Sequence, residues 1–145
     1  MRARSTAAAV ASAIGLGLEV DERFTDLDYG RWAGRTLDQL SPAERTEFRR
    51  WQRQPDVPLP GAEDPRAAQR RACDALVERA ASAGCVAIVT HDAILQLLLC
   101  RVLGIAMQAY RGIAQHTATL NEVRFHGDGW KVYLLNSTWH LDTAD

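Results

Sequence analysis

The stretch Val86-Ala-Ile-Val-Thr-His91 decides the fold of this chain. Four consecutive apolar residues, three of them β-branched, predict a short strand over residues 86–89 that is buried on both faces. The apolar run 94–103 follows almost at once and predicts a helix that ends at Gly104. A strand followed directly by such a helix is half of a βαβ unit, so the sequence predicts an α/β fold.

His91 is placed between this strand and this helix. In open α/β sheets, ligands bind at the carboxyl ends of the strands, and a helix N-terminus attracts anions. An imidazole there can donate to a phosphate or take part in acid–base chemistry. The alternative is a histidine that caps the helix or fills the core. Asp92 would repel an anion unless its side chain points away.

Length and composition favour a single domain over residues 1–145. Apolar residues make up 47% of the chain and charged residues 24%, and the net charge is −1. This balance gives no reason to expect a nucleic-acid or membrane partner. The three cysteines lack CxxC spacing, so we expect neither a disulfide framework nor a zinc site, and we expect a reducing cytoplasm. No cofactor or metal is expected, and the oligomeric state stays open.

Outward from the deciding stretch, local start and stop signals predict three more helices, over residues 4–14, 42–52 and 65–83. Ser41 with Glu44 has the spacing of a capping box, and Asp64 before proline is an N-cap signal. An extended piece at residues 18–20 follows the first helix. The last third predicts a hairpin, with strands over residues 119–125 and 130–135. Six arginines are expected on solvated helix faces, namely Arg45, Arg49, Arg53, Arg66, Arg70 and Arg71.

Three further residues can carry phosphate chemistry. Arg2 offers the bidentate guanidinium fork that phosphate oxygens fit, although a terminal arginine is commonly just a solvated charge. Asp26 and Asp28 lie on a glycine-bearing loop, where a carboxyl group can donate a proton if its surroundings raise its pKa. The alternative is that both residues are ordinary aspartates in a turn, without a catalytic role.

Five motifs follow one another along nearly the whole chain in an order that resembles the histidine phosphatase superfamily, the phosphoglycerate mutase-like proteins. The motifs are Arg2-Ala-x-x-Thr-Ala, Asp26-x-x-x-Gly30-x-Trp32-x-Gly34, Pro60-Gly-Ala-Glu-Asp64, Val89-Thr-His91-Asp and Leu135-Asn-Ser-Thr-Trp-His140-Leu. The resemblance implies a three-layer α/β/α fold with its site at the carboxyl ends of the sheet strands. It implies a phosphohistidine intermediate that water cleaves, and a small phosphorylated metabolite as substrate.

The resemblance assigns a role to each candidate. Arg2 becomes a phosphate-binding arginine, and His91 becomes the second pocket histidine, which both binds phosphate and stabilises the transferring group. Asp26 falls where the family has a glutamate as general acid, one methylene longer, with Asp28 as the weaker candidate.

The chain departs from the family in one respect, because the sequence contains no Arg-His-Gly motif to supply the nucleophilic histidine. Met1 matches the position before the arginine in a Ser-Pro-Leu-x-Arg-Ala pattern, so we expect a chain shortened at its amino end. It would lack the first strands of the central sheet and be inactive alone. Only 25 residues, 35 to 59, separate Gly34 from Pro60, which favours a phosphatase over a mutase. The alternatives are a non-catalytic phospholigand-binding or interaction module and a phosphoglycerate mutase.

Overall fold

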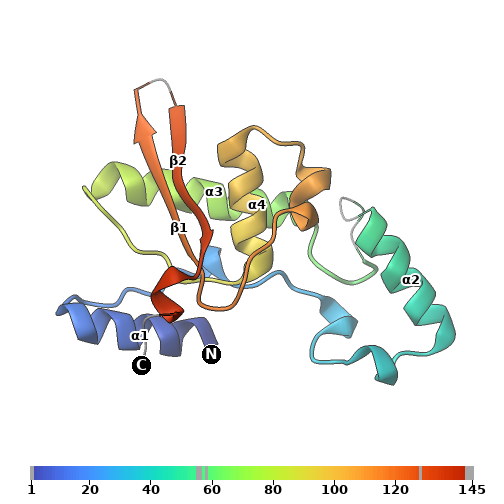
Figure 1. The fold of residues 1–145 in the computed structure, drawn as a ribbon. Helices are drawn as coiled ribbons and strands as arrows, with labels where there is room; N and C mark the ends of the chain where they lie inside the picture. Colours follow the sequence, from blue (N-terminus) through green and yellow to red (C-terminus); the bar gives the residue numbers. More distant parts are fainter. Residues whose placement is uncertain (1, 55–56, 58, 128, 143–145) are drawn as a thin grey trace.

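The computed structural model describes residues 2–54, 57, 59–127 and 129–142, and it shows a mixed α/β chain (Figure 1). Four α-helices are present in these ranges: α1 (Arg2–Ile14), α2 (Pro42–Arg53), α3 (Pro65–Ser82) and α4 (Asp92–Leu103). Two strands, β1 (Leu120–His126) and β2 (Gly129–Ser137), form an antiparallel hairpin. Among the described residues, no helix is long and apolar enough to cross a membrane.

The helix ends follow the local signals in the sequence. Ser41 accepts from the backbone N–H of Glu44, and the Glu44 side chain accepts in return from the Ser41 N–H, which completes the capping box of α2. Asp64 caps α3 by accepting from the Arg66 N–H. Gly104 ends α4 in the left-handed conformation that glycine adopts without strain. The predicted helix boundaries are therefore confirmed to within two residues.

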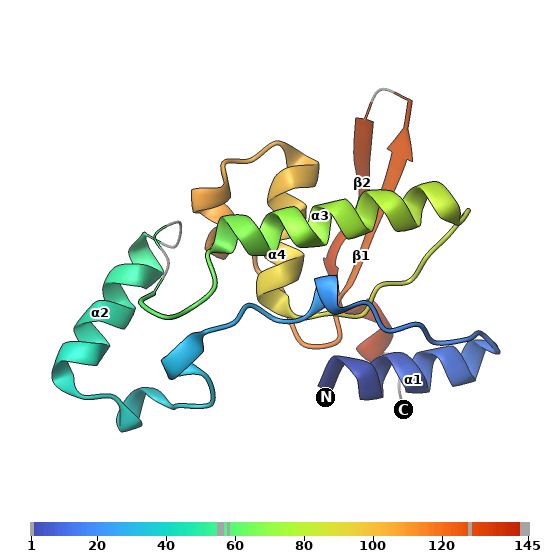
Figure 2. The same ribbon diagram turned by 180° about the vertical axis from the view of Figure 1, so that it is seen from behind.

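The core forms where α4 packs against α3. α4 buries six side chains, and three buried alanines of α3, Ala68, Ala72 and Ala75, let the two helices approach closely. In both ribbon views α2 lies to one side of this pair (Figures 1 and 2). α2 joins the core through Trp51, which is 5% exposed.

The predicted strand at residues 86–89 is wrong for this structure. The segment is extended, but it forms no ladder with any described residue, and the described sheet contains only β1 and β2. A strand exists only when a neighbouring strand pairs with its backbone, and apolar composition alone cannot supply that neighbour.

Candidate functional site

His91 and Asp26 form the centre of the candidate site. The His91 Nδ1 lies 3.3 Å from the Asp26 Oδ2, and both side chains are partly buried. A carboxylate beside Nδ1 restricts the orientation of the imidazole, which leaves its Nε2 to meet a ligand. Of the sequence-predicted site residues, these two are brought together.

Local structure positions both partners. His91 has extended backbone angles and occupies the N-cap position of α4, so its side chain lies beside the free N–H groups of the first helical turn. The preceding Thr90 donates from Oγ1 to the carbonyl of Phe24 at 2.6 Å, which ties the approach to α4 to the loop that carries Asp26. Asp26 itself accepts from the Leu27 N–H at 2.9 Å. The loop and the helix N-terminus therefore meet at two places, the Thr90–Phe24 hydrogen bond and the contact between His91 and Asp26.

Arg71 on α3 holds the same loop from its other side. Its guanidinium donates to the carbonyls of Arg23, Thr25 and Asp26 at 2.7, 3.0 and 3.2 Å. It also makes a paired contact with the Glu63 carboxylate, with both N–O distances at 2.8 Å. The expectation that Arg71 is solvated is wrong, because it satisfies backbone carbonyls that the loop cannot pair internally. Nothing in the helical spacing of Arg71 distinguishes it from Arg70.

Glu63, which directly precedes the N-cap of α3, links this segment to the loop that carries Asp26 and Asp28, called here the aspartate loop. Arg71 holds the pKa of Glu63 below its usual range. The Glu63 N–H donates to the carbonyl of Asp28 at 2.7 Å. Next to this contact Gly30 has a φ of +53°, and a Cβ built there would lie 1.9 Å from the carbonyl oxygen of Gly61. Only glycine fits this close approach, so two of the motifs quoted from the sequence meet here as one structural unit.

An aromatic cluster borders the loop. Tyr29 packs edge-on against Trp51 with ring centroids 5.8 Å apart, and the guanidinium of Arg111 lies 4.0 Å from the Trp51 ring centroid. Burial and the negative charge of Asp26 raise the pKa of Tyr29 to about 12, so its hydroxyl stays protonated at neutral pH. Sequence analysis missed Tyr29 and Arg111. Tyr29 lies inside a quoted motif, but Arg111 carries no sequence signal.

Asp28 and Arg2 are placed differently from the central pair. The Asp28 carboxylate accepts from the Gly30 N–H at 2.7 Å and is therefore engaged in its own turn. Arg2 lies in the first turn of α1 with its side chain exposed. The first turn of α1, through Ala3 and Arg4, nevertheless borders the same groove as His91. The role of Arg2 as a phosphate ligand stays a prediction.

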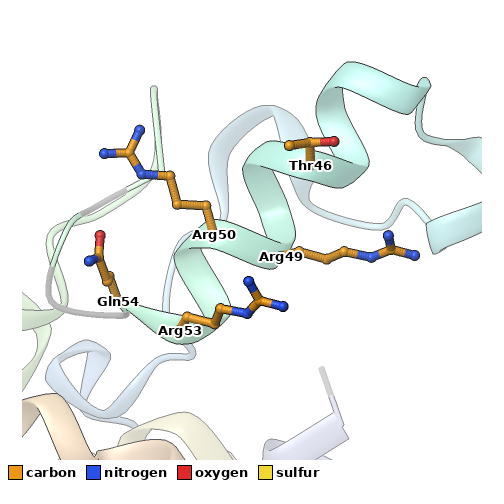
Figure 3. Close-up of a pocket in the computed structure, with 5 residues that line it drawn as sticks. All are labelled: Thr46, Arg49, Arg50, Arg53 and Gln54. Carbon is orange, nitrogen blue, oxygen red and sulfur yellow. The ribbon is translucent and has the colours of Figure 1, made fainter.

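A second hollow, of about 510 Å³, lies on α2 between arginine side chains (Figure 3). Its lining comes from the last two turns of α2 and the residue after it: Thr46, Arg49, Arg50, Arg53 and Gln54. Arg49 and Arg53 are exposed, as expected for a solvated face. Arg45 is not, because its side chain donates to the carbonyls of Leu40 and Asp38. Since no second element contributes to it, this hollow is a space between surface side chains.

Comparison with known proteins gives a match to a protein family. Residues 1–138 match the model of the "Histidine phosphatase superfamily (branch 1)". The "Probable phosphoglycerate mutase GpmB" of Klebsiella pneumoniae is 30% identical over 153 aligned positions, which cover 99% of this chain and 66% of that protein. Curated relatives are longer, and the chain spans between 39% and 70% of the length of those it matches.

Solved structures share the fold. Bacillus stearothermophilus YhfR superposes with a TM-score of 0.84 at 23% identity, and the match covers 97% of this chain and 71% of that one. The mycobacterial glucosyl-3-phosphoglycerate phosphatase Rv2419c, in complex with VO3, also gives a TM-score of 0.84, at 20% identity, over 94% of this chain and 73% of that one. The arrangement of helices and hairpin around His91 is therefore that of a known α/β fold.

Proposed function

The chain belongs to the histidine phosphatase superfamily, and on this premise we propose that it carries part of a site that hydrolyses phosphomonoesters of small metabolites. The single observation that carries the proposal is the contact between the Asp26 Oδ2 and the His91 Nδ1, at 3.3 Å, at the N-terminus of α4. A fixed imidazole beside free helix N–H groups is a suitable receptor for a phosphoryl dianion.

His91 is assigned to binding and stabilising the phosphoryl group. In its protonated form the imidazole carries hydrogen on both ring nitrogens, so Nε2 can donate to a phosphoryl oxygen while Nδ1 faces the Asp26 carboxyl group. The first turn of α4 adds backbone N–H groups and the positive end of its helix dipole. Arg2 is assigned a guanidinium contact to the same group, an assignment that rests on the superfamily resemblance.

Asp26 is the better candidate for the proton donor. Each carboxylate accepts from one backbone N–H, and of the two it is Asp26 that also lies next to the His91 imidazole. In the proposed reaction, the ester P–O bond breaks as the phosphoryl group passes to a nucleophilic histidine. Asp26 in its protonated form gives its proton to the departing oxygen. Water then cleaves the phosphohistidine and releases inorganic phosphate.

The nucleophile is the part that this sequence does not provide. None of the four histidines stands in an Arg-His-Gly motif, and the superfamily resemblance assigns His91 to stabilising the transferring group and not to attacking it. We therefore expect residues 1–145 alone to bind phosphate without turnover. Loss of a covalent nucleophile and its neighbouring arginine removes most of the rate enhancement in this kind of chemistry.

Hydrolysis of p-nitrophenyl phosphate by purified 1–145, together with calorimetric titration of inorganic phosphate and vanadate, tests the proposal. We expect no turnover above background, and binding that His91→Ala weakens about tenfold, the loss of one charge-assisted hydrogen bond. His126→Ala, in the hairpin, is the matched control and should bind as the unmodified chain does. Turnover that disappears in His91→Ala would overturn the expected inactivity. Binding that is absent, or indifferent to His91, would remove the assignment of the site.

A non-catalytic phospholigand-binding module is the second candidate function, and the missing Arg-His-Gly motif is the observation that favours it. The two differ when a separate polypeptide that contains an Arg-His-Gly motif is added to the protein. A phosphatase gains p-nitrophenyl phosphate hydrolysis, whereas a binding module gains none. Phosphoglycerate mutase activity, suggested by the name of the Klebsiella relative, is distinguished by interconversion of phosphoglycerates without release of phosphate.

A further inference from the structure

Arg111 lies on a short 3₁₀ helix, η4 (Met107–Gly112), that packs against α4. The side chain of Gln96 on α4 donates to the carbonyl of Ile113, directly after η4, at 2.9 Å. Tyr110 in the same short helix is completely buried. In both ribbon views η4, in orange, lies between α4 and α2 (Figures 1 and 2). Arg111 is therefore presented toward α2 from a helix that is anchored on α4.

Aromatic rings hold the guanidinium of Arg111. Its Cζ lies 4.0 Å from the ring centroid of Trp51 and 5.3 Å from that of Tyr110, and both rings are buried. Within the described part of the chain Arg111 forms no ion pair, and its buried Nε has no hydrogen-bond partner. The negative face of a tryptophan ring attracts a guanidinium, most strongly where water is excluded. The stacking contact with Trp51 thus replaces the carboxylate that a half-buried arginine usually has.

The stack continues from Trp51 into the aspartate loop. Trp51 packs edge-on against Tyr29 at 5.8 Å, and Tyr29 lies three positions after Asp26. The positive charge of Arg111 opposes the rise in the pKa of Tyr29 that burial and Asp26 cause, so both charges act on the same hydroxyl. A chain of contacts from Arg111 through Trp51 to Tyr29 therefore joins η4, and with it α4, to the loop that carries Asp26.

We propose that Arg111 is a positioning residue for the pair formed by Asp26 and His91. The two partners come from different elements, the aspartate loop and the N-cap of α4, so their 3.3 Å contact depends on how these elements are held together. Arg71 fastens the loop to α3 by hydrogen bonds to its carbonyls. Arg111 fastens the same loop to α4 through the aromatic stack. This inference rests on the proposed function, which assigns the pair to the phosphoryl group.

Calorimetric titration of inorganic phosphate into variants of purified 1–145 tests the inference. We expect Arg111→Met, which keeps a long side chain but no charge, to weaken phosphate binding about fivefold through loss of the cation–π contact. Arg111→Lys keeps a cation over the ring and should recover part of this loss. Arg31→Met is the matched control. Arg31 also stacks on a tryptophan, Trp32, at 5.0 Å, but it is exposed and pairs with Glu47, so phosphate binding should not change.

A double-mutant cycle separates positioning from a general loss of structure. If Arg111 acts through the pair, Arg111→Met should add almost nothing in a His91→Ala background, because the contact that it supports is already gone. Circular dichroism checks that each variant is folded, and Arg111→Gln takes the place of Arg111→Met if the latter does not fold. An equal loss with and without His91 overturns the inference. So does a loss in Arg31→Met as large as that in Arg111→Met.

The same titrations distinguish failure of this inference from failure of the proposed function. Phosphate binding that His91→Ala weakens but the Arg111 variants leave unchanged removes the positioning role alone. Absence of phosphate binding in the unmodified chain overturns the proposed function, and the positioning role with it.

Discussion

α4 and α1 have nearly the same length, 12 and 13 residues, but they differ completely in how they are held. α4 buries six side chains in the core, whereas α1 buries none. Short helices are marginal in water unless tertiary packing stabilises them. The contrast shows that α4 is stabilised by core packing that α1 lacks. α1 instead exposes apolar side chains such as Val10 and Ile14 to solvent.

The largest effect is expected from a cavity in the well-packed half. Leu97 of α4 is completely buried, so Leu97→Ala should lower the free energy of unfolding by about 2–5 kcal/mol. Val10→Ala in α1 should change it by no more than about 0.5 kcal/mol, because Val10 is already exposed. Urea denaturation followed by circular dichroism measures both. Equal losses in the two variants would break the contrast between the helices.

A smaller effect is expected from replacing Arg71, whose guanidinium holds the aspartate loop. Arg71→Ala removes the guanidinium donor from three backbone carbonyls and from the Glu63 carboxylate, which keeps only the Asp28 N–H, and this should cost about 2 kcal/mol of unfolding free energy. Arg70→Ala, at an exposed neighbouring position of the same helix, should cost almost nothing. If the Arg71 clamp positions Asp26, Arg71→Ala should also weaken phosphate binding. Unchanged stability and binding would show that the loop holds its shape without the clamp.

The smallest effect on stability is expected from lowering the pH. Hydrogen bonds from Arg23, supported by Arg79, hold the pKa of Asp21 well below its usual range. A carboxyl group whose pKa is lowered by folding stabilises the folded state above its unfolded pKa of about 3.9, and this contribution is lost as the pH falls through the folded value. Stability should therefore decline below about pH 4. In Asp21→Asn that decline should be shallower in urea titrations from pH 5 to pH 2, and an identical slope would contradict the assignment.

Local sequence signals predicted the helices and the β1–β2 hairpin well and the strand at residues 86–89 poorly, for a physical reason. The capping box of Ser41 and Glu44 and the Asp64 cap act over three residues, so the sequence contains both partners. The segment 86–89 has the composition of a buried strand, but pairing depends on a distant neighbour that composition does not specify. In this structure no described residue provides one.

The candidate site was also predicted in part, and the part that was missed depends on distant partners. The motif order placed Asp26 and His91 in one pocket, and the structure brings them within 3.3 Å. Arg71 was assigned to the surface because a helical position reveals periodicity and not what lies opposite. Its partners are three carbonyls some 45 to 48 positions earlier in the chain. Because every residue has a backbone carbonyl, the sequence does not indicate which carbonyls a side chain will contact.

The contact between Gly30 and Gly61 has a consequence for anyone who diversifies this protein. Libraries that randomise residues 28–34 should tolerate new side chains at several sites yet return glycine at position 30 among folded clones, since even a methyl group would collide with a peptide carbonyl. Gly34 also has a positive φ but faces open space, so asparagine is admissible there. Sequencing the survivors would separate a glycine kept for room from one kept for backbone angle.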